Sequence, residues 1–363
     1  MAMVVKNNMS AISTLNTLNK NSSALAKSLQ KVSSGMKING AADDASGYAI
    51  SERMRVQIRG LDQANSNTQN GSSMMKVAEG AVSSTVDILK TLKEKVINAA
   101  NDTNTDSDRQ TIQKELNQSI DQINDNANVT FNGKYLVDGS HNKKIQQTST
   151  HLTNQSLSNE TVSTTTLVGL EDRNGNNLNI HVKDNVTVSY VKQGKTYTTT
   201  FVVAADTKLS DIVTKANAAG NANDLKFASA TSVIGLDSSG NTVYTADGTS
   251  AISISTANTG GVGNQISGLT ISITDSDGNI NKSANAVLDN FSETIRAENA
   301  GPDNSLVLQV GTKANQAIKV GLSDMRSEAL GLSGSDGSKL NISTQVKANA
   351  AINVLDNAVQ KAL

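Results

Sequence analysis

The 363-residue chain contains no cysteine, which excludes disulfide bonds, thiolate catalysis and cysteine-bound zinc. Aromatic residues make up only 2% of the sequence and tryptophan is absent, so few side chains are large enough to fill a thick, enzyme-like core. The single proline, Pro302, leaves long helices almost uninterrupted. Residues 1–10 lack the apolar run of a cleaved signal peptide, and no segment is apolar enough to span a membrane. These absences favour long regular elements in a non-enzymatic protein that needs another route for any export.

Charge is nearly balanced over the whole chain, at a formal net charge of −1, but the first 60 residues are basic. They hold eight Lys or Arg against three Asp or Glu, a net charge of +5. These cations are spread around a helix and lack the clustered arginines and stacking aromatics of a nucleic-acid site. We therefore predict a solvated or subunit-facing helix surface, with no nucleic acid as partner.

A first amphipathic helix is predicted over residues 10–34, ending at Ser33-Ser34-Gly35. Its apolar positions recur every three or four residues and form one stripe: Ile12, Leu15, Leu18, Leu25, Leu29 and Val32. The helix is too polar for a membrane and too regular for a linker. Its stripe should therefore pack against other helices.

A second, longer helix is predicted from a heptad spacing that runs from Met54 to Ala100, in which nine of fourteen seam positions are apolar. The predicted coiled-coil packing positions are Met54, Ile58, Leu61, Met75, Val82, Val86, Leu89 and Val96. Polar residues in the middle of the seam would fix register or partner at a cost in stability. Because a helix gains most of its stability from packing, this one requires partner helices.

A third helix is predicted to begin at Ser107, where Ser107 and Gln110 have the spacing of a capping box, and to continue to Ala127. A polar turn over residues 101–106 precedes it, so the second and third helices should form an antiparallel hairpin. Asn132-Gly133, between two short apolar segments, then predicts a β-hairpin.

The hydrophobic period changes from helical to two after Gly139, which predicts a β-rich insertion over residues 141–303. Candidate strands within it are 178–182, 186–190 and 197–203, and one short helix is expected around 209–216. Turns are expected at Asn174-Gly175, Gly194, Gly240 and Gly278.

Beyond Pro302, two more strands are predicted, at 305–310 and 317–320, followed by a helical pattern from Ala348 to Leu363. The pattern stops without a C-cap glycine or a polar tail, so we expect the chain to be truncated at its C-terminus.

Several local strings occur in the order in which bacterial flagellin, the filament subunit of the bacterial flagellum, carries them. The strings follow Ser33-Ser34-Gly35 and are Lys37–Met54, Val77–Ala81, Phe131–Leu136, Asp324–Gly331 and Ile342–Gln345. They cover residues 1–140 and 304–363, so both ends of the chain resemble this family, whereas the resemblance does not extend to the middle of the chain.

The longest string contains what the resemblance implies is a spoke loop between the first two helices. Its residues are Gly35, Ile38, Asn39, Asp43, Asp44, Gly47 and Arg53. Gly35 and Gly40 allow backbone conformations that are closed to other residues. Asp43 and Asp44 are expected to cap and charge-stabilise the start of the long helix.

The resemblance implies an α+β fold in which long antiparallel coiled-coil helices from the chain ends carry a β-rich inserted domain. Residues 1–35 would be the inner-tube helix, 36–140 the N-terminal part of the helical core, 141–303 the variable outer domain and 304–363 the truncated, returning part of the core. The function implied is that of a flagellar filament subunit for motility. It would be exported by the flagellar type III apparatus to the cell exterior, without enzymatic activity or cofactor.

The partners implied are other flagellin subunits, an export chaperone and the cap protein. Two alternatives stay open: a hook-filament junction protein of the same family, or a secreted flagellin fragment whose outer domain is adhesive. The match at the spoke loop favours filament flagellin over the junction protein.

The resemblance also places a Toll-like receptor 5 epitope on the second and third helices. The usual Arg and Leu anchors of the family fall on Thr91 and Lys95, while its Glu falls on Glu115. Replacing a bidentate arginine and an apolar anchor removes residue types that carry interface energy. We therefore predict weak receptor activation.

Other chemistry finds little support in the sequence. The three histidines, His141, His151 and His181, are not in a His-Glu-x-x-His arrangement, so no zinc peptidase is predicted. Residues 275–279 resemble the start of a calcium loop, but Ala286 stands where its glutamate would be, so we predict a hairpin turn.

Overall fold

The computed structural model describes residues 8–220, 224–230, 232–246, 248–257 and 260–363. The start of the predicted inner-tube segment, residues 1–7, therefore lies outside the described residues. The chain divides into two compact units. Unit 1 comprises Met1–Asn70 and Leu308–Ile318, and unit 2 comprises Gly71–Val307 and Lys319–Leu363.

Unit 1 contains the first helix, α1 (Met9–Ser34), and the first part of α2 (Ala45–Ala100). The Asn8 side chain accepts a hydrogen bond from the Ala11 N–H, and α1 ends at Gly35, whose φ of 66° is left-handed. The predicted end of the first helix is thus confirmed. A hairpin of β12 (Leu306–Gln309) and β13 (Ala317–Val320) also contributes to this unit, where the Asn67 side chain donates to the Gln309 carbonyl (3.2 Å).

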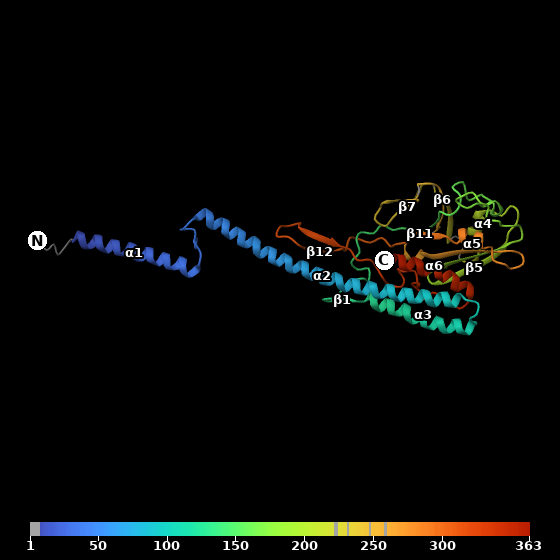
Figure 1. Cartoon of the computed structure of the whole chain (residues 1–363), viewed down its shortest axis with the longest axis horizontal. Helices are drawn as coiled ribbons and strands as arrows, with labels where there is room; N and C mark the ends of the chain where they lie inside the picture. The colour runs from blue at the N-terminus through green and yellow to red at the C-terminus, as the bar shows by residue number, and fades with distance from the viewer. Residues whose placement is uncertain (1–7, 221–223, 231, 247, 258–259) are drawn as a thin grey trace. The chain divides into compact units, whose positions relative to one another are not determined.

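The helical part of unit 2 is an antiparallel hairpin of α2 with α3 (Asp106–Ala127), as Figure 1 shows. Three contacts define its register. The Asn126 side chain donates to Ser84 Oγ (3.0 Å), Lys95 pairs with Glu115 (2.5 Å), and Arg109 Nε donates to the Ala99 carbonyl (2.9 Å). The predicted helical hairpin is confirmed.

The start of α3 differs from the predicted one. Its N-cap is Thr105, and a capping box joins Thr105 to Asp108, so the predicted box of Ser107 and Gln110 is wrong. Thr105 lies two residues before Ser107 and has the same spacing of three to an acceptor side chain, that of Asp108. Asp is also favourable in the first turn of a helix.

The β-hairpin after α3 is confirmed. It pairs β1 (Thr130–Phe131) with β2 (Lys134–Tyr135), and both turn residues, Asn132 and Gly133, have positive φ (50° and 75°). This is the type I′ geometry that an Asn-Gly turn favours.

Two antiparallel sheets form the β-rich part of unit 2. The three-stranded sheet has the order β10-β4-β5, and the four-stranded sheet has the order β11-β3-β9-β6. The strands are β3 (His151–Asn154), β4 (Asn185–Lys192), β5 (Lys195–Val202), β6 (Leu225–Ala230), β9 (Ala251–Thr256), β10 (Ile266–Thr274) and β11 (Phe291–Ile295). The smaller elements are η1 (Leu167–Gly169), α4 (Leu209–Ala219), the hairpin of β7 (Val233–Leu236) with β8 (Thr242–Tyr244), η2 (Val262–Asn264) and α5 (Lys282–Leu288).

The core of this part combines apolar residues of both sheets with α4 and α5, including Leu152, Tyr190, Ile212, Ile254, Ile271 and Leu288. The predicted strands at 186–190 and 197–203 and the helix at 209–216 are confirmed as β4, β5 and α4. The predicted strand at 178–182 is wrong. Leu178 and Ile180 are buried, but Asn179 has a φ of 52° and breaks the extended backbone.

The last helix, α6 (Gln345–Ala362), packs in unit 2 against the three-stranded sheet as well as near α2 (Figure 1). Its side chains Asn353 and Asn357 donate to the carbonyls of Leu269 and Ser267 (3.0 and 2.8 Å), and Asp356 pairs with Lys93 of α2. Gly268 makes the close approach possible, because a Cβ at this position would lie 2.9 Å from Val354 Cγ2.

The long helices joined to a β-rich insertion confirm the predicted α+β fold class. Among the residues that the structure describes, no helix is long and apolar enough to cross a membrane.

Candidate assembly surfaces

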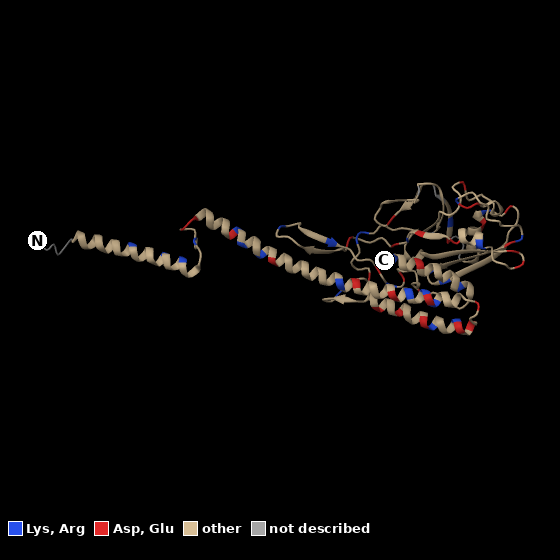
Figure 2. Cartoon of the chain, in the orientation of Figure 1, with Lys and Arg blue, Asp and Glu red and all other residues tan. Residues whose placement is uncertain are grey.

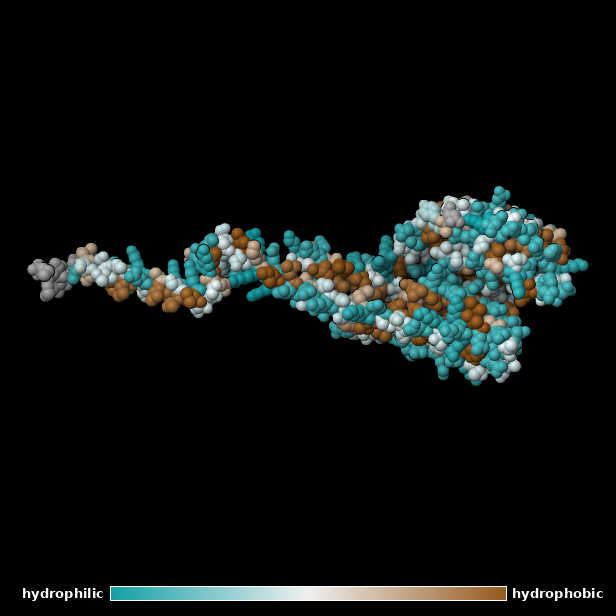
Figure 3. All heavy atoms as spheres, in the orientation of Figure 1, coloured by the Kyte–Doolittle hydropathy of each residue, from teal (hydrophilic) through white to brown (hydrophobic). Residues whose placement is uncertain are grey.

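The apolar stripe of α1 is exposed along its whole length. Its six members, from Ile12 to Val32, have exposed fractions between 48% and 80%, and α1 has no buried residue. Figure 2 shows the charged residues of α1 as isolated spots, and Figure 3 shows hydrophobic surface between them. A helix with such a stripe in water is a surface for a partner.

The predicted packing positions of α2 fall into two groups. Met54, Ile58 and Leu61, in unit 1, are 56–57% exposed. In unit 2, Met75 and Val82 are half-buried, while Val86, Leu89 and Val96 are buried. The seam therefore changes along one helix from a free surface to a packed one.

The buried stripe of α2 in unit 2 also includes residues that the heptad pattern did not select. They lie mostly one position before the predicted seam: Met74, Ala78, Ala81, Thr85, Leu92 and Ala99. A helix that contacts two neighbours buries a wider stripe than a two-stranded coiled coil does. The recurrence of small residues at Ala78, Ala81 and Ala99 is the signal that could have indicated close helix contacts.

The spoke loop is held by a small polar network in unit 1. Asp43 accepts from the Asn39 N–H (3.2 Å) and pairs with Lys31 (3.4 Å), while the Asn39 side chain donates to the Gln30 carbonyl (3.3 Å). The Asn39 N–H, followed by Lys31, lowers the pKa of Asp43 below its usual value. The network fastens the loop to the end of α1.

Asp44 is the residue that caps α2, because its carboxylate accepts from the Gly47 N–H (3.0 Å). The predicted capping role of Asp43 is wrong, since that carboxylate faces Asn39 and Lys31. Gly47 lies so close to Asp44 that a Cβ would be 2.5 Å from its Oδ2, and Ile38 is half-buried beside the same glycine. Arg53 is exposed.

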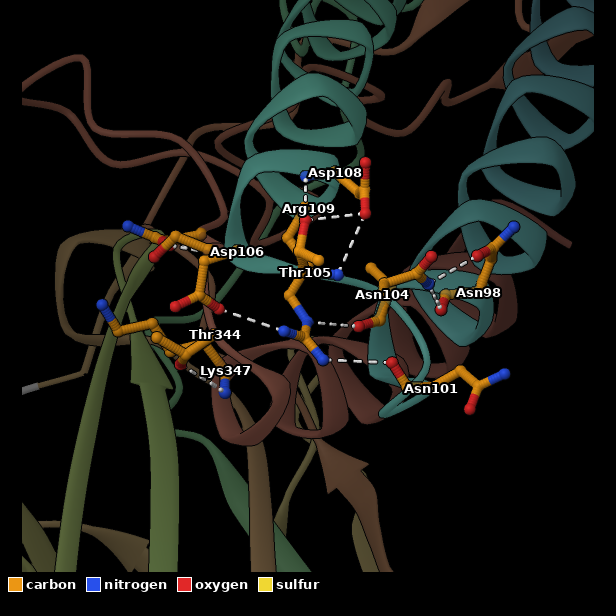
Figure 4. Close-up of polar contacts among 12 residues, drawn as sticks. Asn98, Asn101, Asn104, Thr105, Asp106, Asp108, Arg109, Thr344 and Lys347 are labelled. Carbon is orange, nitrogen blue, oxygen red and sulfur yellow. Dashed lines mark hydrogen bonds and ion pairs between the residues drawn. The ribbon is translucent and has the colours of Figure 1, made fainter.

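Arg109 organises the turn between α2 and α3, and the sequence reasoning missed it. Figure 4 shows its guanidinium reaching from α3 to the end of α2, where it donates to the carbonyls of Ala99 (2.9 Å) and Asn101 (3.0 Å) and to Asp106 (3.0 Å). Asn104 donates to the Asn98 carbonyl in the same turn (2.6 Å). Cations at a helix C-terminus satisfy its free carbonyls. This explains why an arginine is 5% exposed here.

The predicted receptor-epitope positions lie on the α2–α3 hairpin. Lys95 and Glu115 form an ion pair across the two helices, and the Thr91 hydroxyl donates to the Asp87 carbonyl within its own helix (3.0 Å). Glu115 is thus already engaged by a lysine of its own chain.

The candidate sites for other chemistry resolve into structural roles. Asp275 accepts from the N–H groups of Asp277 and Asn279 (2.9 and 2.7 Å), which confirms the predicted turn. Hydrogen bonds from Asn279 lower the pKa of Asp275. The His141 ring lies 3.3 Å from the Asn304 carbonyl, and burial lowers the pKa of His151. In the described part of the chain, no three His, Cys, Asp or Glu residues are grouped as a metal site would require.

Comparison with known proteins gives a family match in the N-terminal region. Residues 5–143 match the family described as bacterial flagellin N-terminal helical region. The flagellin of Clostridium tyrobutyricum is 47% identical over 139 residues, which are 38% of this chain and 37% of that protein. The flagellin of Bacillus subtilis (strain 168) is 46% identical over 142 residues, or 38% of this chain and 47% of that protein. The chain thus spans less than half the length of these relatives.

A solved structure of FliC from Burkholderia pseudomallei aligns with 80% of this chain and 94% of its own. Its sequence identity is 18% and its TM-score is 0.27.

Proposed function

We propose that this chain, whose residues 5–143 match the N-terminal helical region of bacterial flagellins, is a structural subunit of a bacterial flagellar filament. The observation that carries this proposal is the free apolar surface of α1 and of the first part of α2. Long helices bury such stripes against other helices. Neighbouring subunits of the same family are the partners that these stripes fit.

The proposed role places the protein outside the cell, on the flagellum. Export through the flagellar type III apparatus, an export chaperone and a filament cap protein belong to this proposal. The absence of cysteine supports it, because a chain exported unfolded cannot then be cross-linked on the way. We assign no enzymatic activity, and motility is the function of the assembled filament.

Co-assembly with a related flagellin tests the proposal. The labelled chain is mixed with an excess of soluble Bacillus subtilis flagellin and short filament seeds, and the labelled share of the pelleted filaments is measured. We expect incorporation, and we expect Ile58→Asp to reduce it strongly, because a carboxylate would be desolvated at a helix contact. Electron microscopy of the pellet distinguishes filaments from aggregates.

The matched control is Gln57→Asp, at the neighbouring exposed position of the same helix. It adds the same charge outside the predicted seam and should leave incorporation unchanged. Incorporation that is equally insensitive to Ile58→Asp, or absent for the native chain, would contradict the proposal.

Weak activation of Toll-like receptor 5 is a further part of the proposal. It is supported by the ion pair that Lys95 makes with Glu115 and by the lack of an arginine at Thr91. In a reporter-cell assay, Thr91→Arg combined with Lys95→Leu should raise activation, since both anchor types are then present and Glu115 is released. Native activity equal to that of a standard agonist flagellin would refute this part.

A further inference from the structure

The two edges of the three-stranded sheet differ in how their backbone groups are satisfied. At β10, side chains and a turn cover the outward-facing groups. The Ile271 N–H donates to Asp289 (3.0 Å), the Ile273 N–H donates to Asn285 (2.6 Å), and the Ile273 carbonyl accepts from the Asn281 N–H (3.0 Å). Asn353 and Asn357 of α6 bind the carbonyls of Leu269 and Ser267 in the same way. This edge is closed to another strand.

Among the residues that the structure describes, none covers the β5 edge in this way. Its partner β4 is joined to it by the two-residue turn Gln193-Gly194, in which both φ values are positive (51° and 73°). Such a turn makes Lys192 and Lys195 a hydrogen-bonded pair, so Tyr197, Thr199 and Phe201 also bond to β4. The N–H and C=O groups of the alternate residues, Thr196, Thr198, Thr200 and Val202, point away from β4. None of them has a hydrogen bond to any residue that the structure describes.

The features that usually protect an edge strand are missing from β5. Its register with β4 continues through all eight pairs without a bulge, and it contains no proline. Its one charge, Lys195, stands at the first position and pairs with Asp336. Thr198, Thr200 and Val202 are exposed. A regular, uncharged edge rich in Thr and aromatics is a template for strand addition.

The sequence of β5 is complementary to itself in one antiparallel register. With Thr199 opposite its own symmetry mate, Tyr197 faces Phe201, Thr198 faces Thr200 and Thr196 faces Val202 of the other copy. This register places the outward residues of one copy opposite those of the other, and about eight backbone hydrogen bonds satisfy every outward group of both strands. The aromatic pair forms twice, and like charges do not meet.

From this edge we propose that β5 is a homotypic strand-addition site, which joins the three-stranded sheets of two copies of this chain into one antiparallel sheet around Thr199. The contact lies in the β-rich insertion and uses neither α1 nor the exposed part of α2. It can therefore form whether or not the helices assemble into a filament, and in a filament the high local concentration of subunits would strengthen it.

Single-cysteine variants of the full chain test the register, because the native sequence has no cysteine. Thr199→Cys places two thiols opposite each other in a non-hydrogen-bonded pair, where cross-strand side chains are closest. Under mild oxidation we expect it to form disulfide-linked dimers about tenfold faster than Thr198→Cys, whose thiols are offset in this register. Non-reducing gels over time give both rates.

Thr198→Cys is the matched control because Thr198 is exposed whereas Thr199 is half-buried. If random collision governed the reaction, Thr198→Cys would react faster, and that result would overturn the proposal. A mixture of Thr198→Cys and Thr200→Cys should yield the heterodimer in preference to either homodimer, since these residues face each other.

A second variant blocks the edge without breaking the sheet. Thr200→Pro removes an N–H that points away from β4, so the fold should keep its circular dichroism and its thermal midpoint within a few degrees. In the Thr199→Cys background it should reduce the dimerisation rate to that of Thr198→Cys. An unchanged rate in a folded Thr200→Pro chain would also overturn the proposal, and a loss of folding would show that this N–H bonds to β4.

Discussion

The two compact units differ in how far their apolar side chains are exposed to solvent. In unit 1, the stripe of α1 and the residues Met54, Ile58 and Leu61 of α2 stay exposed, and the polar contacts of the spoke loop join residues close in sequence. In unit 2, the continuation of α2 is buried with α3 and α6, and residues far apart in sequence supply the contacts. One heptad pattern can therefore be completed within the chain or be left for partners.

The largest contrast is expected between a buried and an exposed leucine. Leu355 of α6 is 0% exposed, whereas Leu18 of α1 is 63% exposed. Leu355→Ala should lower the free energy of unfolding of unit 2 by about 2–5 kcal/mol, because it leaves a cavity. Leu18→Ala should change it by less than about 0.5 kcal/mol. Urea unfolding followed by far-UV circular dichroism measures both, and equal effects would remove the distinction between the units.

A half-buried lysine at the end of α6, Lys361, gives unit 2 a dependence on pH. Burial and the nearby Arg296 lower the pKa of Lys361 from 10.5 to about 8, while Glu298, Asp324 and Glu293 act in the opposite direction. Between these two values the unfolded state binds more protons, so the free energy of unfolding rises with pH. Measurement should stay below pH 10, because burial raises the pKa of Tyr190 and its ionisation in the unfolded state then lowers stability.

We expect a rise of about 2 kcal/mol between pH 8 and pH 10 in the native chain. Lys361→Met should flatten it, since the titrating group is gone. The exposed Lys215→Met on α4 serves as the control and should keep the native slope. A native slope in Lys361→Met would show that another group is responsible.

Arg109→Ala should have a smaller effect, localised at the helical turn. It leaves the Ala99 and Asn101 carbonyls without their donors, which costs about 1–2 kcal/mol. Arg53 is an exposed residue of α2, and Arg53→Ala should change the free energy of unfolding by less than about 0.5 kcal/mol. Hydrogen exchange of the last turn of α2 should accelerate only in Arg109→Ala. Acceleration of that turn in both variants would argue against a specific capping role.

The sequence correctly predicted elements that neighbouring residues determine. The prediction failed where contacts with residues far away in the sequence determine which side chains are buried. The end of α1 at Gly35, the Asn132-Gly133 turn and the α2–α3 hairpin depend on neighbouring residues, and these predictions held. The buried face of α2 depends on α6, which lies some 250 residues later in the chain. Periodicity along α2 alone could not show a wider stripe, because it carries no information on how many neighbours a helix has.

Two misplaced features have similar causes. Thr105 and Ser107 both have the spacing of a capping box, and only the backbone decides between them. The alternation at Leu178 and Ile180 reports burial correctly, but burial does not require a strand when no neighbouring strand pairs with the segment. The sequence did not indicate the role of Arg109, because an arginine in a helix is usually exposed to solvent.

The smallest effect is expected in unit 1, at the spoke loop. Asp43→Asn weakens the contacts to Asn39 and Lys31, so the Asn39 amide should exchange faster while the Gly47 amide, bound by Asp44, does not change. Asp44→Ala should produce the reverse pattern, because it removes the N-cap of α2. The contribution of Asp43 is present above its unfolded pKa of 3.8 and is lost as pH falls through its lowered pKa. Protection of the Asn39 amide should follow that titration, and protection that persists in Asp43→Asn would mean that the loop is held by other contacts.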